Sequence, residues 1–218
     1  MRLRNWTGMG RTLLLAGVVA VSAVCLAGCE GDDNPSGGDN NGGNTNNGGN
    51  NNNGGGGSSE TVLLGGLKWM KKNLNVQSAD SWCYDNADSN CVKYGRLYTW
   101  EAAKSACQSV GMRLPTRVEW NDLVDAVGES AGKKLKARSG WYNDGNGTDD
   151  YGFSALPGGY SYSYGNFGYA GNCGRWWTAT EHGDNDAYYL GMYDGNDGVD
   201  EYYDLNEYYG YSVRCVKD

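Results

Sequence analysis

The sequence has few of the residues on which several common functions depend. It holds one histidine, His182, and no Gly-x-Ser-x-Gly motif, so nothing in it predicts a Ser-His-Asp hydrolase. It has no CxxC pair or Cys/His cluster, so a structural zinc site is not expected. Lys and Arg number 18 against 26 Asp and Glu and form no basic stripe, so nucleic-acid binding is not expected. Phenylalanine is scarce, at 2 residues against 17 Tyr and 8 Trp, and rings with a polar tip therefore dominate.

The N-terminus has the pattern of an export signal. Residues 1–11 hold three Arg, and residues 12–27 are almost wholly apolar but too few to span a bilayer comfortably. The apolar stretch ends in Leu-Ala-Gly-Cys at residues 26–29, which resembles the bacterial lipobox. We therefore predict a signal peptide over residues 1–28 and lipidation of Cys29, giving an exported lipoprotein on the outer membrane or cell surface. An uncleaved anchor with a chance cysteine is the alternative.

A tract without large apolar side chains follows. Residues 30–59 contain 11 Gly and 10 Asn, a composition that cannot bury a core. We predict that residues 29–59 form a lipidated, disordered tether with a reach of about 30 Å. Self-association of the Asn-rich tract is the alternative. Residues 60–218 remain for one folded domain, with 15 basic and 22 acidic residues and a net charge of −7.

The domain has two helix signals followed by strand signals. Thr116 can cap a helix, Glu119 can complete a capping box, and the apolar periodicity that follows stops at Gly128. An earlier helix is predicted from about Thr99 to Val110. Short aromatic and β-branched segments, typical of strands, lie at residues 175–180, 187–192 and 211–216. The sequence therefore predicts an α+β fold with two helices and a loop-rich, mainly antiparallel sheet.

Five cysteines lie in the predicted domain. They allow fifteen arrangements of two bridges and one thiol, so spacing alone does not decide the pairing. Cys83 and Cys91 flank a turn-rich segment, which favours a local bridge. A Cys107–Cys215 bridge would tie the first helix to the last strand, and Cys173 would be left over.

Several motifs in order resemble a known family. They are Tyr-Gly-Arg-Leu-Tyr-Thr-Trp at residues 94–100, Arg-Leu-Pro-Thr at 113–116, Gly-Phe-Ser-Ala-Leu-Pro at 152–157 and Ser-Val-Arg-Cys-Val at 212–216. Together they resemble the Fibrobacter succinogenes major paralogous domain over residues 66–218. That family resembles in turn the formylglycine-generating enzyme and C-type-lectin-like superfamily. The resemblance implies a C-type-lectin-like fold, a C-terminal strand beside the N-terminal one and an exported address, but no settled activity.

Catalysis has little support in the sequence. The oxidases of the formylglycine-generating type use two cysteines close together near the C-terminus, whereas Cys173 and Cys215 are far apart in this sequence. A two-carboxylate glycosidase remains an open alternative, because spacing in the sequence does not give the distance between two carboxyl groups. No catalytic residue is predicted.

Two regions, residues 144–150 and residues 181–207, have the oxygen-rich composition that calcium prefers. Residues 181–207 carry nine acids and no Lys or Arg, and such a cluster repels itself unless a cation or solvent screens it. The possible ligands are Asp144, Asn146, Asp149, Asp194 and Asp197. Hydrated turn acids are the alternative, so calcium is kept as possible and no other cofactor is expected.

Tyrosine gathers in the second half of the chain, where 14 of the 17 lie between residues 142 and 211. Tyr160, Tyr162 and Tyr164 alternate, so one face of a strand would carry all three rings. Flat amphipathic rings suit sugar faces or protein partners. The candidate ligand-binding residues are Tyr160, Tyr162, Tyr164, Tyr188 and Tyr202. The alternative is that these rings only pack Gly-rich loops.

These observations favour a surface-exposed bacterial lipoprotein that acts as a non-catalytic binding or adhesion module. The expected partners are the membrane, through the lipid anchor, and a polysaccharide or an envelope protein. Two alternatives stay open. One is an enzyme derived from the formylglycine-generating fold with altered chemistry, and the other is a purely structural envelope protein.

Overall fold

A computed structural model describes residues 60–162, 165–205 and 208–218. The predicted signal peptide, Cys29, the tether and Tyr164 lie outside these residues. Within the described part of the chain, no helix has the length and apolar character needed to cross a bilayer.

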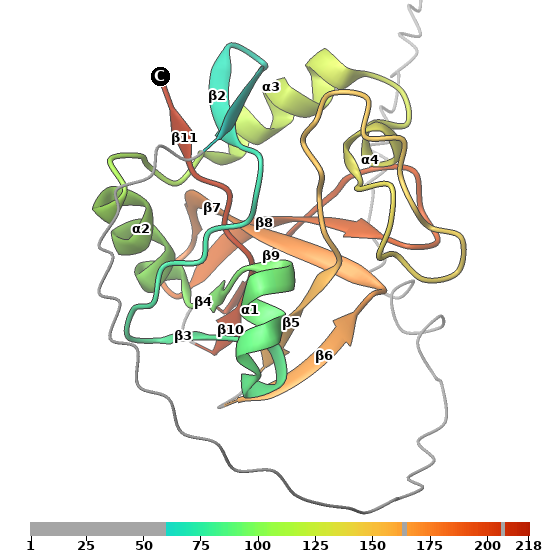
Figure 1. The fold of residues 1–218 in the computed structure, drawn as a ribbon. Helices are drawn as coiled ribbons and strands as arrows, with labels where there is room; N and C mark the ends of the chain where they lie inside the picture. The colour runs from blue at the N-terminus through green and yellow to red at the C-terminus, as the bar shows by residue number, and fades with distance from the viewer. Residues whose placement is uncertain (1–59, 163–164, 206–207) are drawn as a thin grey trace, which may run out of the picture. The chain divides into compact units, whose positions relative to one another are not determined.

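The described residues combine helices and strands, which confirms the α+β class (Figure 1). The helices are α1 (Asp88–Tyr94), α2 (Trp100–Ser109), α3 (Arg117–Val127) and α4 (Ala131–Leu135), and a 3₁₀ turn, η1 (Tyr84–Asn86), precedes α1. The strands are β1 (Thr61–Leu64), β2 (Leu67–Met70), β3 (Ser81–Trp82), β4 (Leu97–Tyr98), β5 (Gly158–Tyr162), β6 (Asn166–Ala170), β7 (Cys173–His182), β8 (Asp186–Tyr193), β9 (Asp200–Leu205), β10 (Tyr209–Gly210) and β11 (Val216–Lys217). The expectation of two helices is wrong, because the described residues form four.

The two predicted helices are α2 and α3. In α3 the Glu119 amide donates to Thr116 Oγ1 (3.2 Å) and the Thr116 amide donates to Glu119 Oε2 (2.8 Å), which completes the capping box. Gly128, with φ of 76°, ends the helix. Helix α2 ends at Ser109, and Val110, the residue that follows it, is exposed.

Helices α1 and α4 were missed because they are too short to show a 3.6-residue periodicity. Such short helices gain their stability from tertiary contacts rather than from propensity. The Lys133 amide of α4, for example, donates to the carbonyl oxygen of Asp197 (3.0 Å).

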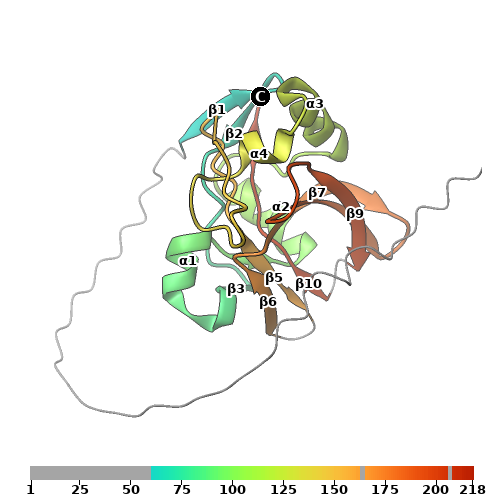
Figure 2. The same ribbon diagram turned by 90° about the vertical axis from the view of Figure 1, so that its right-hand side faces the viewer.

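Three sheets make up the β structure. The largest has the strand order β10-β5-β7-β8-β9, with β6 added on β5, and its pairs are antiparallel except for β5 and β7. Strands β1, β2 and β11 form a second sheet, and β3 pairs with β4. Figure 2 shows β5, β6 and β10 together at the end of the domain away from the β1–β2 hairpin.

The C-terminal segment connects all three sheets. Tyr209 in β10 pairs with β5, Tyr211 bridges Tyr98 of β4, and Val216 in β11 pairs with Trp69 of β2. The C-terminus therefore lies beside the N-terminal hairpin, as the family resemblance implied (Figure 1). The expected continuous strand over residues 211–216 is wrong, because the segment changes sheets and forms only short pairings.

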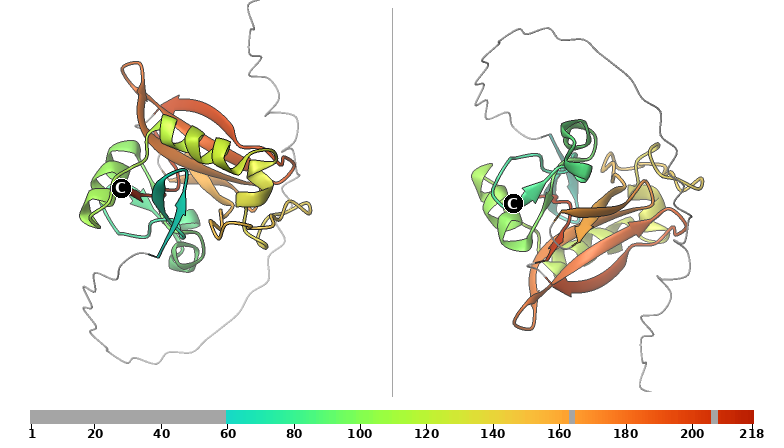
Figure 3. Two further views of the ribbon diagram at one scale, coloured as in Figure 1. Left: turned by 90° about the horizontal axis from the view of Figure 1, so that it is seen from above. Right: turned by 90° about the horizontal axis from the view of Figure 1, so that it is seen from below.

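The long strands β7 and β8 are covered on both faces. Trp176 and Leu190 belong to a buried cluster that includes Trp120 and Leu123 of α3. Their neighbours on the two strands belong to a second cluster, with Ala103 and Cys107 of α2. Figure 3 shows α3 lying along one face of these strands. Trp100, Trp120, Trp176 and Trp177 are all buried.

The described residues contain one local and one long-range disulfide. Cys83 is bonded to Cys91 and Cys107 is bonded to Cys215, the two pairings that the sequence favoured. The second bond closes a loop of 108 residues and joins α2 to the C-terminal segment. Cys173 is buried outside both bonds.

Candidate functional site

Strand register decides which tyrosines share a face of the large sheet. Trp177 on β7 pairs with Tyr189 on β8, and Tyr189 pairs with Tyr202 on β9. Arg175 lies two residues before Trp177 and therefore points to the same face. This face carries rings on three adjacent strands and a guanidinium on one of them.

Rings from β5, β6, β10 and the C-terminal segment complete this face. We call the group the tyrosine–arginine cluster, and its members are Tyr160, Tyr162, Tyr169, Arg175, Tyr189, Tyr202, Tyr209 and Tyr211. Tyr160 is its hub. The centroid of its ring lies 5.4 Å from Tyr169 in a stacked arrangement and 5.8 Å from Tyr162. These separations are typical of stabilising aromatic pairs.

The cluster has a buried floor and an exposed rim. Tyr211 and Tyr189 are 0% and 5% exposed and form the floor. Tyr162 and Tyr169 are each 39% exposed, and both are braced by the partly buried ring of Tyr160. The rim therefore offers flat ring surface to solvent on a support that is already packed.

Arg175 lies among the rings with few polar partners. Its guanidinium carbon is 4.0 Å from the centroid of Tyr160 and 5.2 Å from that of Tyr189. Nη1 donates to the Tyr211 hydroxyl over 3.3 Å, while Nε is buried and has no hydrogen-bond acceptor among the described residues. The Tyr211 hydroxyl in turn donates to Asp204 Oδ2 (2.9 Å). The arginine charge is thus linked to a carboxylate through one phenol.

Burial raises the pKa of Tyr160, and Arg175 partly opposes the shift. Burial also raises the pKa of Tyr211 well above its ordinary value. Both phenols are therefore neutral at physiological pH and able to donate hydrogen bonds. The cluster presents neutral rings and one cation, and the Asp204 carboxylate contacts it through the Tyr211 hydroxyl.

The structure brings together only part of the predicted ligand-binding set. Tyr160, Tyr162 and Tyr202 belong to the cluster. Tyr188 does not, because it pairs with Tyr203 and points to the opposite face of the sheet. There its ring contacts Arg117, whose guanidinium carbon is 4.4 Å from the ring centroid.

The candidate ligand-binding set lacks five members of the cluster: Tyr169, Arg175, Tyr189, Tyr209 and Tyr211. Alternation along residues 175–177 was a usable signal, because it places the arginine on the face of Trp177. The contributions of Tyr169 and Tyr211 depend on pairings between distant strands, which the local pattern does not contain.

The two predicted calcium loops lie side by side. Asn143 Nδ2 donates to Asp194 Oδ2 (2.7 Å), and the backbone of Gly145 packs against Asp194 so closely that a Cβ would not fit. Asp144 and Asp197 are exposed. The carboxylate of Asp194 also accepts from Asn172 Nδ2 (2.9 Å). The side-chain amides of Asn143 and Asn172 therefore both donate hydrogen bonds to the Asp194 carboxylate.

Lysines from α4 and the residue that follows it bind the carbonyl groups of the same loops. Lys136 is fully buried, and its Nζ donates to the carbonyl oxygens of Tyr193 (2.9 Å) and Asn196 (2.8 Å). Lys133 Nζ donates to the carbonyl oxygen of Asn146 (2.8 Å). Residues 181–207 contain no Lys or Arg, but the Lys136 ammonium group reaches this acidic segment from elsewhere in the sequence.

Asp149, another of the predicted calcium ligands, is hydrogen-bonded to Ser154. Its Oδ1 accepts from the Ser154 amide (2.7 Å) and its Oδ2 accepts from the Ser154 hydroxyl (2.5 Å). No group of three or more His, Cys, Asp or Glu side chains suited to a metal gathers within the part of the chain that the structure describes. Calcium binding stays a prediction.

One of the two cysteines that an oxidase of the formylglycine-generating type would need is held in a disulfide. Cys215 is bonded to Cys107, so it cannot pair with Cys173. His182, the single histidine of the sequence, ends β7 and stacks on Tyr203 with ring centroids 3.7 Å apart.

Comparison with known families assigns the domain. Residues 62–217 match the sequence model described as the Fibrobacter succinogenes major domain. The chain belongs to this family. No curated protein and no solved structure matches the chain. In this family member the shared motifs have structural roles, since Arg113 forms an ion pair with Glu119 (2.7 Å) and Arg214 is fully buried.

Proposed function

We propose that this protein is a non-catalytic binding module that holds a polysaccharide on the rim of its tyrosine–arginine cluster. The observation that carries the proposal is the pair of half-exposed rings, Tyr162 and Tyr169, braced by Tyr160. A sugar ring has an apolar face and a hydroxyl edge, which a flat ring with a polar tip can match. Because the rings are packed before binding, little side-chain entropy is lost when a ligand stacks on them.

The surrounding architecture is consistent with such a role. We propose that the α+β domain has a C-type-lectin-like fold, supported by the hairpin beside the C-terminal strand and by the two disulfides. We further propose that Cys29 carries lipid and that residues 29–59 hold the domain away from the membrane. Loss of membrane fractionation in a Cys29→Ser variant would support the anchor, and unchanged fractionation would contradict it.

The binding test uses the purified full-length chain and a panel of soluble and insoluble polysaccharides, with calcium and with a chelator. The Tyr162→Ala/Tyr169→Ala variant should lose roughly ten- to a hundredfold in affinity, since each stacked ring contributes about 1 kcal/mol. The matched control is Tyr142→Ala/Tyr203→Ala, which removes two exposed rings outside the cluster.

Saturable binding that only the rim variant loses would support the aromatic platform. Equal loss in both variants, or no binding to any polysaccharide, would contradict it and favour an envelope protein as the partner. If a chelator and the Asp194→Asn substitution both lowered the affinity for polysaccharide, calcium bound at Asp194 would be needed for binding.

A further inference from the structure

A cleft of about 530 Å³ lies away from the rings of the tyrosine–arginine cluster. Its walls come from the segment after β2, from the C-terminal half of α1 and from the loop before β5. The lining residues that matter here are Lys71, Lys72, Asn75, Lys93, Gly152 and Ser154. The volume falls within the range of pockets that bind small organic ligands.

The charge of this cleft is opposite to that of the domain. Residues 60–218 carry a net charge of −7, yet three lysines and a single acid, Glu60, line the cleft. Among the described residues, none of the three lysines forms an ion pair with a carboxylate. Several lysines that line one cleft without carboxylate partners raise the local concentration of anions.

A fourth cation lies behind the wall of the cleft. Arg214 donates from Nε to Asn73 Oδ1 (2.7 Å) and from Nη2 to the carbonyl oxygen of Ser154 (2.8 Å), and both acceptor residues also line the cleft. Among the described residues, its hydrogen bonds all go to neutral oxygens. The Asp149 carboxylate partly offsets this buried charge, and the remainder contributes to the potential of the adjoining cleft, because little solvent screens it.

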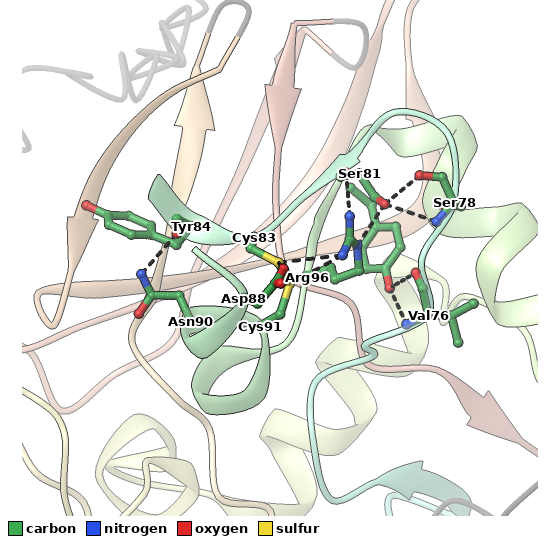
Figure 4. The surroundings of a disulfide bond; sticks show 10 residues. Val76, Ser78, Ser81, Cys83, Tyr84, Asp88, Asn90, Cys91 and Arg96 are labelled. Carbon is green, nitrogen blue, oxygen red and sulfur yellow. Dashed lines mark hydrogen bonds between the residues drawn. A yellow bond between two sulfur atoms is a disulfide. The ribbon is translucent and has the colours of Figure 1, made fainter. Parts of the chain in front are cut away.

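The wall that presents Lys93 is fixed in place. The Cys83–Cys91 disulfide joins α1 to the preceding segment, and Arg96 donates from Nε to Ser81 Oγ (3.0 Å) and from Nη2 to the Ser81 carbonyl oxygen (2.9 Å) (Figure 4). Asn73 Nδ2 donates to the carbonyl oxygen of Tyr94 (2.8 Å), which ties α1 to the opposite wall. The cleft is therefore formed before any ligand arrives.

We propose that this cleft binds a small polar organic anion, about the size of a hexuronic acid, through its carboxylate, sulfate or phosphate group. The lysines would hold the anionic group, and Asn75 and Ser154 would bind neighbouring hydroxyls. The proposal does not depend on the polysaccharide platform, because it uses none of the cluster residues.

The test titrates the full-length chain with glucuronate, glucose 6-sulfate and inorganic phosphate, and with glucose as the neutral control, by calorimetry and NMR. The anions should bind saturably, more weakly at higher ionic strength, and should shift the amide signals of Gly95 and Gly152. Lys71→Gln/Lys93→Gln should weaken binding roughly tenfold or more, as expected for the loss of two charge contacts.

The control Lys68→Gln/Lys217→Gln makes the same change in net charge at two exposed lysines that face each other on β2 and β11. Its affinity should match that of the unmodified protein. Preference for one of the three anions would identify the charged group. Equal weakening in both variants, binding of glucose as strong as that of glucuronate, or no binding of any anion would overturn the proposal.

Discussion

Arg214 and Arg175 both carry a guanidinium into the domain, but their surroundings differ. Arg214 is fully buried and makes four hydrogen bonds of 2.6–2.8 Å, three of them to main-chain carbonyl groups. Arg175 is partly buried and has one hydrogen bond of 3.3 Å, and three tyrosine rings surround it. The Arg214 guanidinium is held mainly by main-chain carbonyl groups, whereas Arg175 Nε has no acceptor among the described residues.

This difference separates a structural cation from one that can serve a ligand. The carbonyl groups around Arg214 come from β2 and from the loop before β5, so the guanidinium holds two distant segments together. Burial lowers the pKa of Arg214 to about 9, and Asp149 opposes the shift. The side chain is still charged at neutral pH, and its charge organises the segments around it.

The largest expected effect is a difference in the free energy of unfolding between variants at the two arginines. Arg214→Met leaves the carbonyl oxygens of Met70, Phe153 and Ser154 buried without a donor, and it should lower the free energy of unfolding by about 3–5 kcal/mol. Arg175→Met removes one long hydrogen bond and ring contacts and should cost about 1 kcal/mol. Urea unfolding followed by tryptophan fluorescence measures both. Equal losses would show that the two sites do not differ as described.

A smaller effect is expected at the loop that supports Arg214. Asp149→Asn places an amide donor against the two donors of Ser154 and should lower the free energy of unfolding by about 1–2 kcal/mol. Asp144→Asn is the matched control, since it makes the same change at an exposed position of the same loop. Thermal unfolding with and without calcium also tests the metal prediction. Calcium-dependent stabilisation lost in both variants would assign Asp149 to metal binding instead.

The comparison also shows what local sequence pattern can predict. The capping box of α3 depends on residues three positions apart, and it was predicted correctly from Thr116 and Glu119. The Cys83–Cys91 bond is local in the same sense. Arg214 could be recognised only as part of a family motif, because its partners lie about 60 and 140 residues away in the sequence.

The candidate site was predicted less well than the fold. Tyrosine enrichment pointed to the right half of the chain, but strand register excludes Tyr188 and includes Tyr211. The acidic segment illustrates the same limit. Cations from elsewhere in the chain reach this segment: Arg117 forms an ion pair with Glu201 (2.6 Å), and Lys136 Nζ donates to the Tyr193 carbonyl oxygen. They lie 84 and 57 residues from these partners in the sequence, so a count of charges along the segment could not find them.

The smallest expected effect concerns Tyr211, whose hydroxyl accepts a hydrogen bond from Arg175. Burial raises the pKa of Tyr211 above its unfolded value of about 10, so the folded state binds more protons than the unfolded state at high pH. The corresponding stabilisation is fully present below pH 10 and is lost as the pH rises beyond that value. Tyr211→Phe should cost about 1 kcal/mol at neutral pH, where two hydrogen bonds disappear, and should make the alkaline decline shallower.

The measurement is the free energy of unfolding between pH 7 and pH 11, with Tyr142→Phe as a control at an exposed ring. The control should keep the slope of the unmodified protein. An unchanged slope in Tyr211→Phe would mean that this phenol does not couple folding to pH. In that case folding would not raise the pKa of Tyr211, and the distinction between the two cations would rest on their hydrogen bonds alone.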